Sequence, residues 1–353
     1  MSNTFREYVK KIGSGTHTGK DLTRAEATQA AKLMLLGEAT PAQIGAFLIA
    51  HRIKRPTANE LAGMLDAYDE LGPKIAANDL SFDYPVTVLG TPYDGRSRTA
   101  PVTPITALIL ATVGVPVVMH GGDRMATKYG LPMVDIWRGL GLDFTQLSLT
   151  EVEQLLVKTG LTFVYTPRHF PLANQLVTYR DQIGKRPPLA SVELIWSPCS
   201  PKVQIIAGFV HPPTEKFFKE TFKLRGVKHF TTIKGLEGSC DLPLSRTAII
   251  GLGNLDLDPG WERLLLAPKD YDFADKDVGL ESETQLIKQM EVVLAGQANE
   301  LSSSVIYNGG FSLWRCGFCA DLKTGFTTAE KLLNQGRVAD KLQEIINLID
   351  QKN

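Results

Sequence analysis

The first part of the chain, residues 1–75, carries apolar residues at the spacing of amphipathic helices. Three helix starts precede them, at residues 23–26 (TRAE), 40–43 (TPAQ) and 57–60 (TANE). The first is a capping box, in which the side chains of Thr23 and Glu26 satisfy two backbone N–H groups, and the second has proline at the first helical position. The pattern predicts a small N-terminal helical bundle.

After Asp83 the pattern changes to short apolar, β-rich runs separated by helical stretches. Strands separated by helices predict a mostly parallel central sheet, and hence a large α/β domain. The predicted strands are residues 86–90, 115–119, 161–165, 203–210 and 229–233.

Two further helical regions complete the predicted organisation. We expect a helical domain at residues 1–75, completed by a helical hairpin near 171–185, and an α/β domain at residues 80–353. The tail reads as a terminal amphipathic helical region that begins at Thr327, in a capping box with Glu330, and runs to Ile349.

Composition narrows the function classes. The chain has 353 residues, of which 43% are hydrophobic and 22% charged, so it can bury a sizeable core and is not a disordered chain. Thirty-eight basic and 38 acidic residues give a net charge of zero, which disfavours a protein that coats duplex DNA but leaves room for a local basic patch. Four cysteines and a start without an apolar signal-like run predict a cytoplasmic location.

Two loops follow predicted strands at the edge of the sheet where α/β proteins bind ligands. The first, residues 90–99, carries glycines and arginines and leads into a helix start near Thr103. Such a loop suits an anion, although an ordinary turn would contain the same residue types. The second, residues 120–130, combines His120, two adjacent glycines, Arg124 and Lys128. His120 could donate a hydrogen bond to a ligand, shuttle a proton, or have only a structural role. Because the two strands are neighbours, both loops can face one cleft.

A third loop, residues 234–241, holds two carboxylates, Glu237 and Asp241, among glycines. Carboxylates of this kind can bind Mg²⁺ together with the phosphates of a substrate. The same residues also fit a simple turn with solvated acids.

The chain resembles the anthranilate phosphoribosyltransferase family, relatives of the pyrimidine-nucleoside phosphorylases, over nearly its whole length. The most specific similarity is in residues 22–27 (LTRAEA), 37–48 (GEATPAQIGAFL) and 60–64 (ELAGM). The resemblance implies a helical domain, a larger α/β domain, an active site in the cleft between them, and a homodimer formed through the helical domain.

The donor motif of this family is altered here. The family reads Gly-Thr-Gly-Gly-Asp-Gly where this chain has residues 90–95 (GTPYDG). Pro92 has no N–H to give a phosphate, and Tyr93 adds bulk. The Asn of the family's following Asn-Ile-Ser-Thr is absent from residues 100–104 (APVTP). Arg96, Arg98, Arg124 and Lys128 are cations that could supply phosphate contacts in its place.

The acceptor and metal motifs are altered in part. The family's Lys-His-Gly-Asn-Arg is matched at residues 119–123 (MHGGD) by His120 and Gly121 alone, whereas the arginine of the helical hairpin is retained as Arg180. The family's Leu-Asp-Glu is replaced by residues 239–241 (SCD), so that Cys240 stands in for one acid.

The resemblance therefore implies transfer of a phosphoribosyl group from phosphoribosyl diphosphate to an aromatic nitrogen acceptor, anthranilate or a relative, as in tryptophan biosynthesis. We expect Glu237 and Asp241 to hold Mg²⁺, and we assign no residue a catalytic role. The alternatives are a catalytically lapsed homodimer that binds nucleic acid, and a sensor of a phosphorylated metabolite. The residues expected to bind the donor are Gly90, Thr91, Asp94, Gly95, Arg96, Arg98, Thr103 and Lys128, and those expected to bind the acceptor are His120, Gly121, Gly122 and Arg180.

Overall fold

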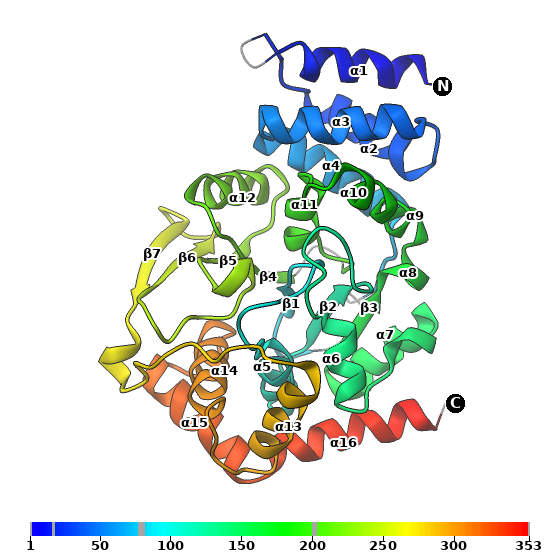
Figure 1. Cartoon of the computed structure of the whole chain (residues 1–353). Coiled ribbons are helices and arrows are strands. Elements are labelled where there is room, and N and C mark those ends of the chain that lie inside the picture. The colour runs from blue at the N-terminus through cyan, green and yellow to red at the C-terminus, as the bar shows by residue number, and fades with distance from the viewer. Residues whose placement is uncertain (1, 16–17, 77–81, 200–202, 352–353) are drawn as a thin grey trace.

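The computed structural model describes residues 2–15, 18–76, 82–199 and 203–351. The N-terminal helices lie at one end of the molecule, the sheet lies in the middle, and the C-terminal helices lie at the other end (Figure 1). This arrangement confirms the predicted fold class, a small helical bundle joined to a large α/β part with a mostly parallel sheet.

The helical part begins where the capping residues predict. Its helices are α1 (Asn3–Gly13), α2 (Arg24–Leu35), α3 (Pro41–Lys54) and α4 (Ala58–Leu71). Thr23 forms the predicted capping box, and the predicted helix starts at Thr40 and Thr57 are capping boxes as well. Helices α2 and α4 pack closely at Gly63, where a Cβ atom would lie 2.2 Å from the carbonyl oxygen of Arg24.

Seven strands form one sheet in the order β3-β2-β1-β4-β5-β6-β7. The first five strands are parallel to one another and confirm the five predicted strands, whereas β6 pairs antiparallel with β5 and β7 pairs antiparallel with β6. Sequence reasoning missed this last pair. The strands are β1 (Val86–Gly90), β2 (Val117–Gly121), β3 (Leu161–Tyr165), β4 (Val203–Gly208), β5 (His229–Ile233), β6 (Ala248–Asn254) and β7 (Trp261–Leu266).

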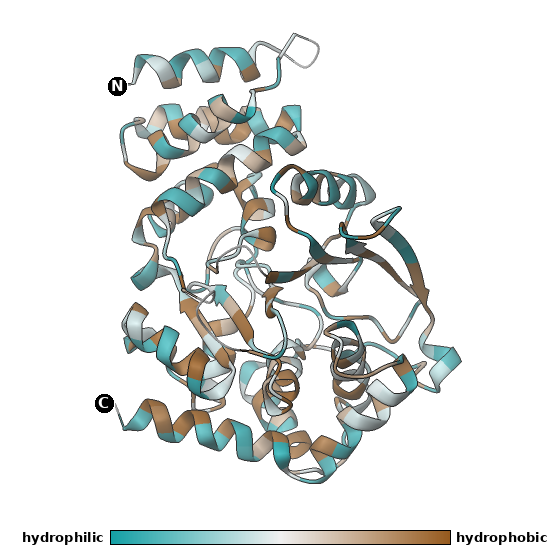
Figure 2. Ribbon diagram, turned by 180° about the vertical axis from the view of Figure 1, so that it is seen from behind, coloured by the Kyte–Doolittle hydropathy of each residue, from teal (hydrophilic) through white to brown (hydrophobic). Residues whose placement is uncertain are grey.

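Helices cover the sheet and bury its apolar side chains. Figure 2 shows apolar colour concentrated on the central strands and on the inner sides of the helices around them. Helix α5 (Thr103–Thr112) is buried along almost its whole length and packs against α14 (Ser302–Arg315) and α16 (Arg337–Asp350). The other helices are α6 (Met133–Gly139), α7 (Leu149–Thr159), α8 (Thr166–His169), α9 (Pro171–Asn174), α10 (Val177–Ile183), α11 (Leu189–Ile195), α12 (Pro212–Leu224), α13 (Glu283–Leu294) and α15 (Leu322–Asn334), with 3-10 turns η2 (Phe144–Gln146), η3 (Leu236–Gly238) and η4 (Pro268–Tyr271).

The predicted helix start at Thr327 is wrong. Helix α15 begins five residues earlier, where the side chain of Asp321 accepts a hydrogen bond from the backbone N–H of Thr324. Thr327 lies inside the helix, and its hydroxyl donates to the carbonyl of Lys323. A threonine in a helix interior satisfies its hydroxyl in this way, so the Thr-x-x-Glu spacing at this position is not a cap.

The middle of the chain joins the two parts. Helices α9 and α10 form where the helical hairpin is predicted, and α10 packs against α3. Helices α11 and α12 pack against α4, and α11 also packs against β1 and β4, so it links the helical part to the sheet. No helix in the described ranges is long and apolar enough to cross a membrane.

Candidate functional site

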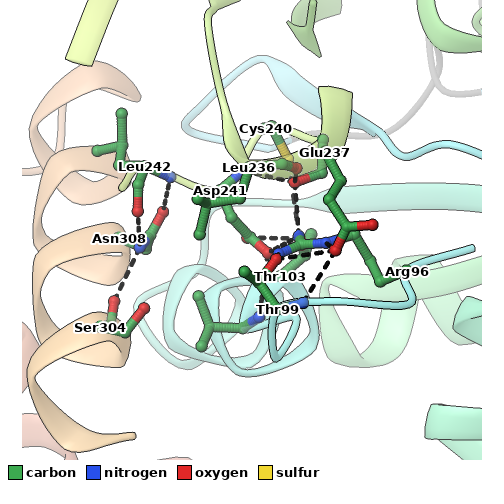
Figure 3. A network of polar contacts seen from close by, with 12 residues as sticks. Arg96, Thr99, Thr103, Leu236, Glu237, Cys240, Asp241, Leu242, Ser304 and Asn308 are labelled. Atoms are coloured by element: carbon green, nitrogen blue, oxygen red, sulfur yellow. Dashed lines mark hydrogen bonds and ion pairs between the residues drawn. The ribbon is translucent and has the colours of Figure 1, made fainter. Parts of the chain in front are cut away.

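Three loops meet at the carboxyl ends of β1, β2 and β5, and Arg96 lies between the two carboxylates that the third loop contributes (Figure 3). Its Nη1 donates to Oδ2 of Asp241 at 2.8 Å and to the hydroxyl of Ser239 at 2.7 Å. Its Nε donates to Oε1 of Glu237 at 3.3 Å. One buried guanidinium therefore contacts two buried carboxylates.

Glu237 is the most heavily hydrogen-bonded group of the site. Its Oε1 accepts from the backbone N–H groups of Arg98 and Thr99 at 3.0 and 2.9 Å, and its Oε2 accepts from the ammonium of Lys128. Burial would raise the pKa of this carboxyl, but the hydrogen bond from Lys128 and the charge of Arg96 outweigh it and hold the pKa well below its ordinary value. Glu237 is therefore ionised at neutral pH.

Lys128 belongs to the same cluster. Its ammonium also donates to the carbonyl of Gly95 at 3.0 Å, so the second loop is tied to the first. Burial lowers the pKa of Lys128, and the contact with Glu237 works in the opposite direction. Arg98 differs, because its side chain is 78% exposed and lies 3.7 Å from Glu237.

Asp241 is fixed from the helix side. Thr103, the first residue of α5, donates its hydroxyl to Oδ1 at 2.7 Å, and the N–H of Val102 donates to Oδ2 at 3.1 Å. The neighbouring thiol, Cys240, is buried, and burial raises its pKa to about 12. It is a neutral thiol at physiological pH, which is a poor ligand for Mg²⁺.

The two carboxylates do not fit Mg²⁺ as they stand. Mg²⁺ keeps several waters and needs free carboxylate oxygens at about 2.1 Å. Every oxygen of Glu237 and Asp241 already accepts at least one hydrogen bond from the protein, and both side chains are almost fully buried. The described residues contain no group of three or more His, Cys, Asp or Glu side chains placed to hold a metal ion.

His120, on β2, is fully buried and neutral. The carbonyl of Trp196 can only accept, so His120 Nε2 carries the proton and donates to it at 3.0 Å. Nδ1 then accepts from the hydroxyl of Tyr93 at 2.7 Å. Burial lowers the pKa of His120 to about 4, although its hydrogen bond to Trp196 opposes the change. Gly121, at the end of β2, and Gly122 are buried beside it.

Arg180, the residue expected to meet an acceptor carboxylate, pairs with a carboxylate of the protein. Its Nη2 contacts Oε1 of Glu193, and both side chains are at least nine-tenths buried. Arg180 Nε and Glu193 Oε2 have no hydrogen-bond partner among the described residues. The charge of Arg180 is therefore compensated, but its hydrogen-bonding capacity is only partly used.

The residues of the first loop are engaged with the protein as well. Asp94 accepts from Nε of Arg186 at 2.9 Å, and Thr91 is buried. Gly90 is required by close packing, since a Cβ atom there would lie 2.1 Å from the carbonyl oxygen of Leu194. Gly95 has φ +75° and packs on the backbone of Gly130.

A pocket of about 500 Å³ opens beside this cluster, between the helical part and the carboxyl ends of β1, β4 and β5. Its walls contain four basic side chains and one acid, Glu237, whose charge is already compensated. A groove of about 680 Å³ continues from it and shares several wall residues. The basic residues of the pocket are Arg52, Lys185, Arg186 and His211.

Two of these cations are available to a ligand. Among the described residues, no carboxylate lies within ion-pair distance of Arg52 or Lys185, whereas Arg186 is paired with Asp94. Arg52 donates to the carbonyl of Arg186 at 2.5 Å, which ties α3 to the segment after α10. We name the set Arg52, Lys185, Arg186 and His211 the interdomain basic cluster.

Sequence reasoning did not single out this cluster, nor Glu193 and Trp196. The only local signal was the run at residues 185–188 (KRPP), a basic pair followed by two prolines just after a predicted helical hairpin. The residues that the sequence predicts to bind the donor and the acceptor lie around one region between the helical part and the α/β part. The sequence does not show which of these residues pair with one another.

Comparison with known proteins gives a consistent picture. Residues 6–72 match the model of a glycosyl transferase family, helical bundle domain, and residues 86–339 match that of a glycosyl transferase family, a/b domain. An anthranilate phosphoribosyltransferase of Afipia carboxidovorans is 29% identical over 97% of this chain and 98% of its own length. One of Acetivibrio thermocellus is 25% identical over 96% of both chains.

Solved structures share the fold. The anthranilate phosphoribosyltransferase of Thermus thermophilus superposes with a TM-score of 0.80 at 18% identity, covering 99% of this chain and 100% of that chain. That of Saccharomyces cerevisiae, in complex with PRPP and Mg, superposes with a TM-score of 0.83 at 16% identity over 99% of each chain.

Proposed function

The chain belongs to the glycosyl transferase family whose helical bundle and a/b domains it carries, and from this premise we propose that it is a phosphoribosyltransferase. The reaction would move a phosphoribosyl group from phosphoribosyl diphosphate to an aromatic nitrogen acceptor, anthranilate or a relative. Relatives that cover almost the whole chain are named for this activity, and one structure of the same fold was solved with PRPP and Mg.

The observation that carries the proposal is the interdomain basic cluster. Phosphoribosyl diphosphate is a small polyanion. A pocket of about 500 Å³, with two cations that have no ion-pair partner among the described residues, is of the size and charge that such a ligand needs. The pocket lies at the carboxyl ends of parallel strands, where α/β proteins bind ligands. Its volume extends into the adjoining groove, which leaves room for a second substrate.

The cluster also suits the chemistry. During transfer the bond between the ribosyl carbon and the diphosphate breaks, and the diphosphate takes the electron pair. The acceptor nitrogen forms the new bond with its lone pair and loses one proton, which the departing diphosphate or water accepts. Preorganised cations at the departing diphosphate stabilise this charge, and removal of one such donor in other enzymes costs about 2.7–4 kcal/mol. Arg52 and Lys185 would supply this stabilisation, and the helical part and α/β part would together exclude water.

The acceptor would lie against the apolar walls of the pocket, Leu194 and Phe209. His120 and Arg180 are buried, and their partners Tyr93 and Glu193 are chain neighbours of the wall residues Pro92 and Leu194. We therefore assign His120, Gly121, Gly122 and Arg180 the role of positioning residues that fix the acceptor wall.

The residues predicted to bind the donor have two roles in the proposal. Arg98, which is exposed, would reach the ligand directly. The others would hold the three loops in place at the edge of the pocket: Gly90, Thr91, Asp94, Gly95, Arg96, Thr103 and Lys128.

Two properties of the whole protein complete the proposal. We expect a homodimer formed through the helical part, which sedimentation of the purified chain would detect. We also place the reaction in the cytoplasm, because all four cysteines, Cys199, Cys240, Cys316 and Cys319, are free thiols, as expected in a reducing compartment.

Turnover tests the proposal. Purified chain, phosphoribosyl diphosphate and anthranilate are mixed, and the loss of anthranilate fluorescence is followed, with related aromatic amines in parallel. We expect turnover that falls about 10-fold or more in Lys185→Ala, since a charged hydrogen bond contributes about 1.5–3 kcal/mol. Lys158→Ala is the matched control, because Lys158 is exposed on α7 and does not line the pocket. Equal loss in both variants, or no turnover with any acceptor, would count against the proposal.

A further inference from the structure

Glu237 and Asp241 lie on either side of a single guanidinium, and this geometry determines which cation they can hold. We propose that Arg96 and Lys128 permanently take the place of a divalent cation here, so that the site binds its anionic substrate without a metal. The part of this inference that concerns the substrate rests on the proposed function. The part that concerns the two carboxylates is independent of it.

The hydrogen bonds accepted by each carboxylate oxygen support the proposal. Oε1 of Glu237 accepts from Arg96, from the hydroxyl of Thr99 and from two backbone N–H groups, and Oε2 accepts from Lys128. The two oxygens of Asp241 accept from Arg96, Thr103 and the N–H of Val102. A metal ion would have to displace several of these donors at once, with no compensating ligand among the described residues.

The charges balance without a metal. Two carboxylates face two buried or half-buried cations, Arg96 and Lys128, and the side chains of Arg96, Glu237 and Asp241 are each no more than 3% exposed. A divalent ion added to this set would leave an excess of two positive charges in a water-poor site, which is unfavourable.

The backbone indicates that the cluster is built for these partners. Glu237 has φ +54° and ψ +22°, a left-handed conformation that costs a non-glycine residue about 1–3 kcal/mol and persists only where the surroundings enforce it. The surroundings are the donors already named, which come from the loops after β1 and β2. Metal ligands on a loop need to reach toward the ion, whereas this carboxylate is turned toward protein donors.

The proposal predicts that removing the guanidinium creates a metal site. Arg96→Ala would leave Glu237 and Asp241 facing each other across the space of one side chain, with Lys128 paired to Glu237 and Asp241 left without a cation. Two carboxylates and entering water are the ligands that Mg²⁺ and Mn²⁺ prefer. Arg96→Lys keeps the positive charge and would bind no metal, although it cannot reproduce the forked geometry.

The test is Mn²⁺ binding followed by electron paramagnetic resonance on the full chain, with circular dichroism to select folded variants. We expect no stoichiometric site in the wild type or in Arg96→Lys. Arg96→Ala should bind one Mn²⁺ at least about tenfold tighter than the wild type, and adding Glu237→Gln should abolish that gain. Lys128→Met serves as the second charge-removing variant if Arg96→Ala does not fold, and Arg246→Ala, whose arginine is half-exposed and pairs with Asp277, is the control.

A single Mn²⁺ site in the wild type that is lost in Glu237→Gln would overturn the proposal, and so would a folded Arg96→Ala or Lys128→Met that gains no site. Substrate binding is read separately, by calorimetry of phosphoribosyl diphosphate in EDTA and in Mg²⁺. Equal affinity in both supports the substrate part, and a strong requirement for Mg²⁺ overturns it. No donor binding under either condition would refute the proposed function while leaving the Mn²⁺ result to stand on its own.

Discussion

The buried pair of Arg180 and Glu193 makes a prediction that can be calculated from the structure. Arg180→Met removes the cation paired with Glu193, whose side chain is 8% exposed and whose Oε2 already has no partner among the described residues. An unpaired carboxylate in this position will take up a proton. Protonating a group of ordinary pKa near 4.5 at pH 7 costs about 3 kcal/mol, because each pKa unit corresponds to about 1.4 kcal/mol.

The packing lost with the arginine side chain adds to the cost of protonating Glu193. We therefore expect a total destabilisation of about 3–5 kcal/mol, the range found when one partner of a buried ion pair is removed. At roughly 2 °C per kcal/mol for a chain of this size, Tm should fall by roughly 6–10 °C. The double variant Arg180→Met/Glu193→Leu should regain most of this stability, because it removes both charges and both unpaired polar atoms.

The assay is thermal unfolding followed by tryptophan fluorescence at several pH values. Burial raises the pKa of Glu193 even beside Arg180, and loss of Arg180 raises it further. Stability should therefore fall more steeply in Arg180→Met than in the wild type as pH rises above about 4.5, where the unfolded chain ionises and the folded variant does not. The gap to the wild type should therefore narrow as pH falls toward 4.5. A loss below about 1 kcal/mol in the single variant, or a double variant as unstable as the single one, would refute this reasoning.

Three other predictions concern parts of the fold outside this pair. Gly63→Ala should destabilise the helical part by about 1–3 kcal/mol, because its Cβ would clash with α2, whereas Gly279→Ala, which meets nothing within 4 Å, should be near neutral in the same thermal scans. Burial would raise the pKa of Glu60, but the pairing with His51 and the hydrogen bonds from the N–H of Leu22 and from Lys54 outweigh it and lower the pKa from 4.5 to about 2. The stability that this carboxylate contributes should be present above pH 4.5 and lost as pH falls toward 2, and acid unfolding of Glu60→Gln should lack this step. The thiol of Cys240 should resist a thiol reagent at pH 8 until the chain is unfolded, and rapid labelling in the native state, located by mass spectrometry, would contradict its burial.

Sequence reasoning succeeded where the signals are local. Capping residues such as Thr23, Thr40 and Thr57 act within one turn of helix, so their pattern is visible in a short window. The five parallel strands are almost fully buried, and each reads as a short run rich in apolar and β-branched residues. The pair β6 and β7 was missed because β7 lies at the edge of the sheet and is largely exposed, and because β6 contains two glycines that weaken a strand pattern.

The site was predicted only in part, because its meaning depends on pairings between distant positions. Glu237 and Asp241 were predicted from the sequence as Mg²⁺ ligands, but their partner Arg96 is 141 and 145 residues away in the sequence. A carboxylate that binds a metal ion and a carboxylate that is paired with a cation of the protein have the same local sequence. The same applies to Arg180, whose retention suggested an open ligand contact, while Glu193 compensates it in the fold.

The central claim is that an anionic sugar diphosphate binds between the helical and α/β parts. Calorimetric titration of the purified chain with phosphoribosyl diphosphate, once in Mg²⁺ and once in EDTA, tests it most directly. The account predicts saturable binding with Kd in about the micromolar range, equal within about twofold in the two buffers and weakened about tenfold or more by Lys185→Ala. No binding at about millimolar donor in either buffer would contradict it.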